Sequence, residues 1–368
     1  MANFDVSKEW AILFPPELIA ARKSAEDLSR YLSLLGARQP VISNPLEGTS
    51  AEAVIVLNSE GYGPEQNGFD WRAAPERVEI YGESVRGLCN GIYGFLAALG
   101  IGWPAPGREN LPAPAAVNPA DPLKGISSRI YSLAIQSACE PSRYEGENSA
   151  GAPWRRFVPA GMRSVKNILK KSEAFAAWAA RRRYDAIVLP LAVFAQGTFV
   201  QGSFVPGMRQ KLDELKKFAA GYDIALEAGG RDLSSLAPRK HFFFHRDFFR
   251  MEDGKRKKAH HFCPTNPGAI RLIGKEGEKI FRAAGEVKVF HLWPDKGAET
   301  AWCSCPSCRA FTPQEQNRIS VNIAADTLAA VNGAASISYY EKPGEGGNIP
   351  LRKNLVKMER LPEEKDIL

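Results

Sequence analysis

The stretch VKVFHLWPDKGAETAWCSCPSC, residues 287–308, decides how this sequence folds. Its first half is a nearly continuous apolar run that ends at Pro294-Asp295, a pattern typical of a strand buried on both faces. Its second half carries Cys-x-Cys-x-x-Cys. The stretch therefore predicts a buried parallel strand with a carboxylate at its end, followed by a loop that holds three clustered thiols.

The same strand-then-helix unit recurs on both sides of this stretch. Strands are expected at residues 129–136, 184–194, 223–230, 287–295 and 336–341, with a sixth candidate at 354–361, and helical patterns lie between them. Such alternation indicates a parallel sheet, and a (β/α) barrel is its natural closure. The units are fewer than a closed barrel needs. The barrel is either truncated, completed by a partner chain, or not a standard barrel.

A different pattern precedes the barrel. Strands are expected at residues 9–13, 40–43, 51–58 and 77–82, with helices at 17–36 and 84–103. The prediction is an α/β fold with a small N-terminal α/β accessory domain (residues 1–103) and a (β/α) TIM-type barrel that is incomplete at its C-terminus (127–368). A Pro- and Ala-rich linker, residues 104–126, joins them.

Charge and hydropathy narrow the classes of partner. The net charge is +7 and the pI about 9.0, but the basic runs at Arg181–Arg183 and Lys255–Lys258 lack the interleaved aromatics of a nucleic-acid platform. We therefore expect solvated surface charge and no nucleic-acid partner, with an acidic substrate such as a uronic-acid sugar as the alternative. No apolar run approaches the ~20 residues of a membrane helix, and no secretory signal precedes the first strand. The sequence as written predicts a cytoplasmic protein without a membrane partner.

Several stretches resemble known families. RVEIYGESVRGLCNGIYGFLAALGIGWPAPG (77–107) is similar to the end of the accessory domain in β-hexosaminidase-like and α-glucuronidase-like glycoside hydrolases, and FAAWAARRRYDAIVL (175–189) resembles their second barrel strand with its preceding helix. Residues 241–269 and 293–310 resemble an uncharacterised bacterial family of glycoside-hydrolase-like proteins with this layout. The resemblance spans nearly the whole chain. It implies hydrolysis of O-glycosyl bonds in a polysaccharide, and it leaves a periplasmic or secreted location open.

Carboxylates at strand ends are the catalytic candidates, because barrel active sites lie at the C-terminal ends of the strands. Glycoside hydrolysis usually needs two carboxyl groups. Asp295, which closes the fourth strand, is the first candidate, and the alternative is that Pro-Asp-Lys-Gly is only a turn. Glu299, in the loop that follows, and Glu341, which closes the fifth strand, are candidates for the second group.

Five other side chains near the strand ends are candidates for substrate binding. Arg231 follows the third strand together with Asp232, and its guanidinium suits a sugar carboxylate, although a surface salt bridge is the alternative. Aromatic side chains there either stack on a sugar or pack in the core. The predicted substrate-binding residues are Arg231, His291, Trp293, Trp302 and Tyr340.

The thiols suggest a metal site. Cys303, Cys305 and Cys308 lie in one loop, and Cys263 lies in the loop of the preceding strand, which is adjacent in a barrel. Four thiolates are the ligands of a structural tetrahedral zinc, which leaves no open position for catalysis. A disulfide through Cys263, or free thiols, are the alternatives. A zinc would pin the two loops together and hold Asp295 in position.

Three functional hypotheses remain. The first is a glycoside hydrolase. The second is a non-catalytic carbohydrate-binding relative, or a relic, that keeps the zinc clip. The third, a nucleic-acid binder built on a zinc knuckle, lacks the surrounding basic and aromatic pattern. A partial barrel also exposes a sheet edge, which predicts either a homodimer through that edge or poor solubility.

Overall fold

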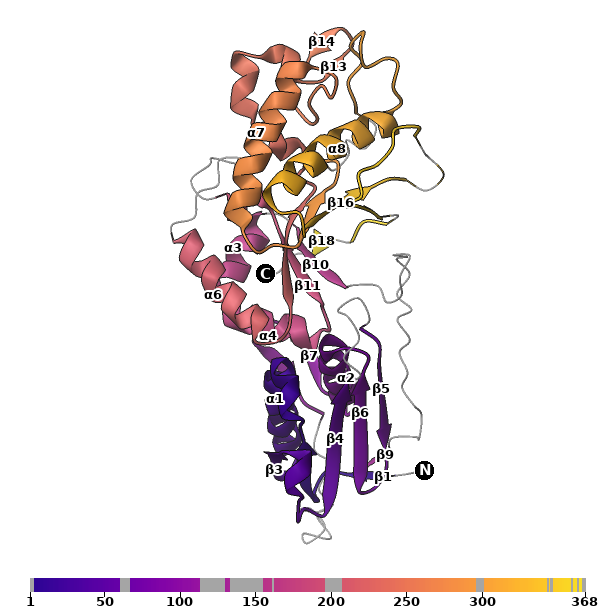
Figure 1. The fold of residues 1–368 in the computed structure, drawn as a ribbon. Helices are drawn as coiled ribbons and strands as arrows, with labels where there is room; N and C mark the ends of the chain where they lie inside the picture. The colour runs from indigo at the N-terminus through magenta and orange to yellow at the C-terminus, as the bar shows by residue number, and fades with distance from the viewer. Residues whose placement is uncertain are drawn as a thin grey trace.

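Two sheets organise the chain, one in each half of an elongated molecule (Figure 1). This computed structural model describes residues 3–59, 67–112, 130–132, 155–160, 162–195, 207–295, 301–342, 344, 347–358, 360–362 and 364–365. Helices and parallel strands alternate in both halves, so the predicted α/β class is confirmed. Within the described residues, no helix is long and apolar enough to cross a lipid bilayer.

The N-terminal sheet has the strand order β3-β2-β4-β6-β5, and only the pair β5–β6 is antiparallel. The sequence analysis missed β5, where charged residues alternate with the buried Phe69 and Trp71. The elements of this half are β1 (Asn3–Asp5), β2 (Glu9–Leu13), η1 (Pro16–Ala21), α1 (Arg22–Leu34), β3 (Arg38–Ser43), η2 (Pro45–Glu47), β4 (Ala53–Ser59), β5 (Phe69–Ala73), β6 (Arg77–Gly82), α2 (Val85–Ala98), β7 (Gly102–Ala105) and β8 (Arg108–Asn110).

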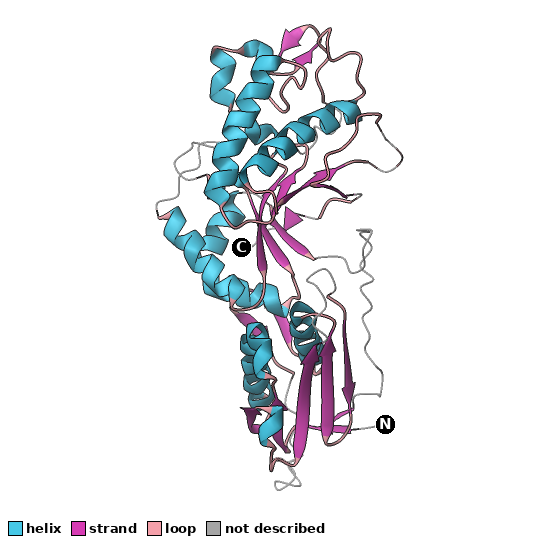
Figure 2. Ribbon diagram, viewed as in Figure 1, coloured by secondary structure: helices cyan, strands magenta, loops and turns pink. Residues whose placement is uncertain are grey.

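The second sheet is parallel throughout, with the order β17-β16-β15-β12-β11-β10-β18. Figure 2 shows helices on the outer side of this sheet. Its main elements are β10 (Arg156–Pro159), α3 (Met162–Lys170), α4 (Ser172–Arg181), β11 (Ala186–Leu189), α5 (Leu191–Phe194), α6 (Met208–Ala220), β12 (Ala225–Gly230), α7 (Pro267–Ala284), β15 (Val289–Leu292), α8 (Pro313–Val331), β16 (Ser336–Tyr340), β17 (Leu355–Met358) and β18 (Glu364–Lys365).

One strand assignment from the sequence is wrong. Residues 129–136 were expected to form the first barrel strand, but Ile130–Ser132 (β9) pairs antiparallel with β1 of the N-terminal half. The first position in the barrel sheet belongs to β10, which pairs with β11. β10 has the sequence Arg-Phe-Val-Pro, whereas the equally short β11 and β15 lie within longer apolar runs that mark them as strands.

The second sheet curls toward closure. Its edge strands, β17 and β18, are separated in the chain only by residues 359–363. Six residue steps span at most about 21 Å, so the two edges of the seven-stranded sheet must approach each other. Because β18 pairs with β10, part of the edge on which the dimer prediction rested is covered.

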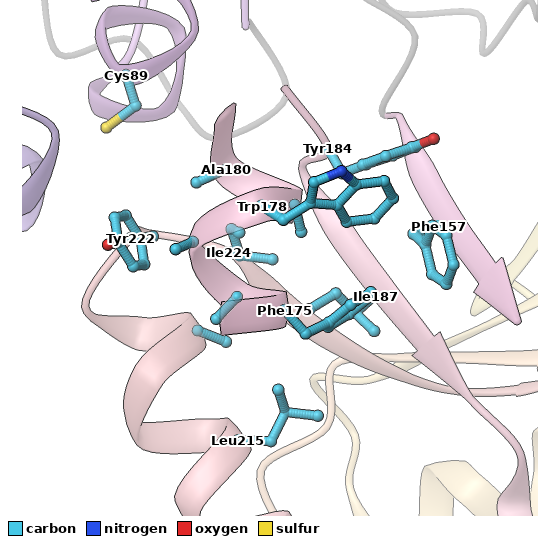
Figure 3. Packing of buried hydrophobic residues seen from close by; sticks show 14 of the residues in the cluster. Cys89, Phe157, Phe175, Trp178, Ala180, Tyr184, Ile187, Leu215, Tyr222 and Ile224 are labelled. Atoms are coloured by element: carbon cyan, nitrogen blue, oxygen red, sulfur yellow. The ribbon is translucent and has the colours of Figure 1, made fainter. Parts of the chain in front are cut away.

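The outward face of this sheet packs against its helices and the N-terminal half. Figure 3 shows Phe157, Phe175, Trp178 and Tyr184 gathered between β10, β11 and α4, with ring centroids 5.2 Å apart for Phe157 and Phe175. The indole of Trp178 donates a hydrogen bond to the carbonyl of Trp103 at 3.1 Å. This hydrogen bond joins the barrel to the accessory domain.

Candidate functional site

A buried ion network lies inside the barrel. Successive side chains on a strand face opposite sides, so the register places Arg156, Glu227 and His291 on the inner face. Arg156 Nε lies 2.6 Å and His291 Nε2 2.7 Å from the same oxygen of Glu227. Burial opposes ionisation of Glu227, but Arg156 and His291 outweigh it and lower its pKa to about 2. Burial lowers the pKa of His291.

Apolar side chains fill the interior above this network. Trp293, which is 1% exposed, packs with Val158 and Val188, and its indole donates to the hydroxyl of Ser338 at 3.0 Å. Tyr340, Met358 and Leu361 pack against the same cluster. Of the predicted substrate-binding residues, His291 and Trp293 therefore lie in the packed interior of the barrel.

Asp295 lies at the mouth of the barrel between two basic side chains. Its Oδ2 is 3.5 Å from Arg239 Nη2 and 3.5 Å from His260 Nδ1. The carboxylate is 19% exposed. Its other oxygen, Oδ1, is buried and accepts no hydrogen bond from the described residues. A carboxylate with one oxygen held and the other unsatisfied is poised for a further partner.

A second carboxylate, Asp232, lies close enough to Asp295 for the charge of Asp295 to raise its pKa. It follows β12, where Gly229 and Gly230 have φ of 109° and 125°. A Cβ at Gly229 would overlap the carbonyl oxygen of His291, so only glycine lets β12 approach β15 so closely. Asp232 accepts hydrogen bonds from the Leu191 amide at 2.9 Å and the Ser235 hydroxyl at 3.0 Å. Burial raises the pKa of Asp232, and the charge of Asp295 raises it further.

The other predicted acids are placed differently. Glu341 is buried and receives two hydrogen bonds from Arg318, at 2.7 and 3.0 Å, with Lys357 3.7 Å away. This pairing is typical of a structural carboxylate. Glu299 lies outside the described residues.

The remaining predicted binding residues also have partners. Arg231 pairs with Glu364 of β18 at 3.4 Å, which matches the salt-bridge alternative. Trp302 is buried and stacks on His261, with ring centroids 4.0 Å apart and planes 8° from parallel. Tyr340 is partly buried.

The four predicted metal ligands converge. The Sγ atoms of Cys263, Cys303, Cys305 and Cys308 all lie within 4.8 Å of one another, and all four residues are buried. Cys263 Sγ is 3.7 Å from Cys305 Sγ and 3.6 Å from Cys308 Sγ. A tetrahedron with Zn–S bonds of ~2.3 Å has S···S edges of about 3.8 Å, so the thiols fit such a metal. No disulfide joins any described cysteine.

Polar contacts support the thiol cluster from both loops. The Met251 amide donates to Cys303 Sγ at 3.2 Å, and the Arg256 guanidinium lies 3.8 Å from the same sulfur. Gln316 of α8 accepts from the Cys303 amide at 3.0 Å and donates to the Cys303 and Cys308 carbonyls. The cluster therefore joins the loop after β12 to the loop after β15, which are the loops that meet at Asp295.

Three residues of the mouth were not chosen from the sequence. Asp232 was noted at a strand end but not assigned a role, while Arg239 and His260 belong to a long loop without periodicity. The one local signal was Gly229-Gly230 directly before Asp232, because paired glycines mark a close backbone approach.

Comparison with known proteins supports the fold. No protein-family model matches the chain, and no curated protein matches it in sequence. Membership in the uncharacterised bacterial family thus remains a resemblance. Among solved structures, the β-N-acetylhexosaminidase from Bacteroides fragilis matches 97% of this chain and 66% of its own, with 14% identity and a TM-score of 0.50. A family 138 glycoside hydrolase targeting pectin rhamnogalacturonan II matches 95% of this chain and 38% of its own, with 11% identity and a TM-score of 0.51.

The chain thus spans less than two thirds of either enzyme. At such low identity the likeness establishes a glycoside-hydrolase-like fold. Activity has to be argued from this chain's own residues.

Proposed function

We propose that this chain is a glycoside hydrolase whose carboxyl pair is Asp232 and Asp295. The observation that supports the pair is the contrast in their surroundings at the C-terminal face of the barrel. The pKa of Asp232 is raised by burial and by the charge of Asp295, whereas Asp295 lies beside the guanidinium of Arg239 and the imidazole of His260. Two carboxyl groups in unlike environments are the usual basis of acid and base roles.

The roles follow from these environments. Asp232 in its acid form donates a proton to the glycosidic oxygen as the bond to the anomeric carbon breaks. Asp295 as carboxylate attacks the anomeric carbon or takes a proton from the attacking water. Arg239 and His260 hold Asp295 in position. The substrate class is a polysaccharide, and the basic surroundings of Asp295 favour one that contains uronic acids.

The test is turnover of aryl glycosides and uronic-acid oligosaccharides by wild type, Asp295→Asn and Asp232→Asn. Each substitution should lower kcat at least about 100-fold, the usual contribution of a positioned acid or base. Asp326→Asn, on an exposed side chain paired with Arg352, is the matched control and should retain full activity. Hydrolysis that survives Asp295→Asn would refute the assignment.

A sugar-binding protein without turnover is the second candidate. It is favoured by the packing of Trp293, Met358 and Leu361 in the barrel interior, which fills space there with apolar side chains. A folded wild type that binds sugars but hydrolyses none of the panel would select this function.

We also propose that Cys263, Cys303, Cys305 and Cys308 hold a structural zinc. The metal would use all four thiolates and supply no chemistry to the substrate. Its role would be to clamp the loop that carries Asp232, Arg239 and His260 to the loop that carries Asp295.

Metal analysis of the purified chain tests the zinc directly. We expect one equivalent of zinc, lost in Cys305→Ser but kept in Cys89→Ser, whose thiol is buried far from the cluster along the chain. Adding zinc at ~100 times its Kd should stabilise the metal-free protein by about 2.7 kcal/mol. An absence of metal, with all six cysteines of the unfolded chain titrating as thiols, would support the free-thiol alternative instead.

A further inference from the structure

A platform of aromatic and basic side chains adjoins the candidate site. Two adjacent phenylalanines, Phe243 and Phe244, are 71% and 87% exposed in the loop after β12. Nζ of the exposed Lys258 lies 4.7 Å from the centroid of the Phe243 ring. Lys240 and Arg246, also exposed, flank the pair in the chain. These five residues are called the Phe–Lys platform.

The segment around the platform concentrates the charge of the whole protein. Residues 239–258 contain eight lysines and arginines and three acidic residues, a balance of +5 within a chain of net charge +7. Two of the acids are already engaged, Asp247 by Asn266 and Glu252 by Arg250. The platform is therefore an electropositive surface.

Some basic residues of this segment contact other groups, whereas the basic residues of the platform itself do not form ion pairs with described carboxylates. Arg256 lies against Cys303, and Arg239 against Asp295. Among the described residues, no ion pair joins Lys240, Arg246 or Lys258 to a carboxylate. Exposed aromatic rings beside unneutralised cations can bind a ligand that has both apolar faces and negative charges.

The platform is continuous with Asp295. Arg239, which contacts Asp295, begins the 3-10 helix η5 (Arg239–Phe243) that ends in the platform. A 3-10 helix rises ~2 Å per residue, so the two ends of η5 are about 8 Å apart. Lys258 precedes His260, the other contact of Asp295, by two residues, or at most about 7 Å along the chain. A polymer that crosses Asp295 would therefore also contact the platform.

We propose that the Phe–Lys platform is a binding subsite for an acidic polysaccharide. The rings of Phe243 and Phe244 pack against the apolar faces of the sugar units, and Lys240, Arg246 and Lys258 contact the uronate carboxylates. The choice of a glycan as ligand rests on the proposed function. The binding itself requires no turnover.

The experiment measures the Kd of polygalacturonate and of neutral galactan for wild type, Phe244→Ala and Lys258→Gln. The matched controls are Leu46→Ala, a 92% exposed apolar residue of the N-terminal half, and Lys216→Gln, a 42% exposed lysine on α6. We expect both platform variants to bind polygalacturonate about tenfold more weakly, which corresponds to 1.4 kcal/mol. Both controls should bind as wild type, and galactan should bind weakly to every variant.

Three outcomes would overturn the proposal. The first is polygalacturonate binding that is unchanged in both platform variants. The second and third are tighter binding to phosphatidylglycerol vesicles or to an oligo-dT strand, lost in the same variants, which would make the platform a membrane or nucleic-acid surface. Asp295→Asn separates this proposal from the proposed function, because it should abolish hydrolysis and leave the polygalacturonate Kd unchanged. Platform-dependent binding by a wild type that hydrolyses nothing would support the subsite and refute the hydrolase.

Discussion

Carboxyl groups lie both in the interior of the barrel and at its mouth, and their surroundings shift their pKa values in opposite directions. Glu227 in the interior is saturated by Arg156 and His291, and its pKa is about 2. Asp232 at the mouth accepts hydrogen bonds from two neutral donors among the described residues, and its pKa is raised. These residues lie five positions apart on one strand and its following turn.

The contrast separates a structural acid from a candidate reactive one. A carboxylate with a full set of charged partners stabilises the fold and has no free oxygen to offer a ligand. A carboxyl group whose ionised form is disfavoured destabilises the fold slightly and gains a proton that it can donate. Strand position alone would have ranked Glu227 and Asp232 together, and the partners distinguish them.

Glu227→Gln should have the largest effect on stability. The substitution leaves the Arg156 guanidinium buried without its counter-charge, and breaking a buried pair from one side costs about 3–5 kcal/mol. The free energy of unfolding in urea measures it. Glu79→Gln is the control, because its pair with Arg77 is about half exposed and such pairs contribute less than ~1 kcal/mol. Equal losses in the two variants would show that the interior network is not structural.

The second-largest expected effect is the loss, at acid pH, of the contribution of Glu227 to the free energy of unfolding. Because its folded pKa of about 2 lies below the ordinary value of 4.5, the unfolded chain takes up the proton first as pH falls. The stabilisation is therefore complete above pH ~4.5 and is lost between about pH 4.5 and 2, a loss of roughly 3 kcal/mol. His291 acts in the same direction below its ordinary value of 6.5, because burial lowers its pKa.

The measurement compares wild type with Glu227→Gln at pH 5 and pH 2.5. The gap between their unfolding free energies should narrow at the lower pH, since the glutamine cannot titrate. A gap that stays constant would mean that folding leaves the pKa of Glu227 unchanged.

The sequence predicted the strands that lie within longer apolar runs or between helices. β11, β12, β15, β16 and β17 all fall within predicted segments, and the first four read as apolar runs because they are buried in a parallel sheet. β10 and β18 lie outside such runs, and their pairing is decided by tertiary closure rather than by local pattern. The β9 segment has a strand pattern, but no pattern specifies which sheet a strand joins.

The sequence likewise indicated some residues of the candidate site and missed others. The sequence singled out Asp295 because it follows a strong strand and the cysteines because they cluster in the chain, and the structure brings the four thiols together. Arg239 and His260 approach Asp295 from a loop of more than thirty residues between β12 and α7, whose course depends on contacts such as the thiol cluster. Loop residues of this kind become visible only once the loop is placed.

Asp232→Asn should have the smallest effect and the opposite sign to Glu227→Gln. A raised pKa means that the fold disfavours the ionised carboxylate, so the native chain is fully penalised above that pKa, and the penalty fades as the pH falls to the ordinary value of 3.8. Asparagine keeps the acceptor for the Leu191 amide and can donate to Ser235, but it cannot ionise. We expect it to stabilise the protein by about 0.5–2 kcal/mol at pH 8, an advantage that vanishes at pH 4.

Thermal unfolding of wild type and Asp232→Asn at pH 8 and pH 4 measures this difference in stability. A variant that gains stability and loses hydrolysis would identify Asp232 as an acid kept for chemistry, whereas a variant destabilised like Glu227→Gln would place it with the structural network.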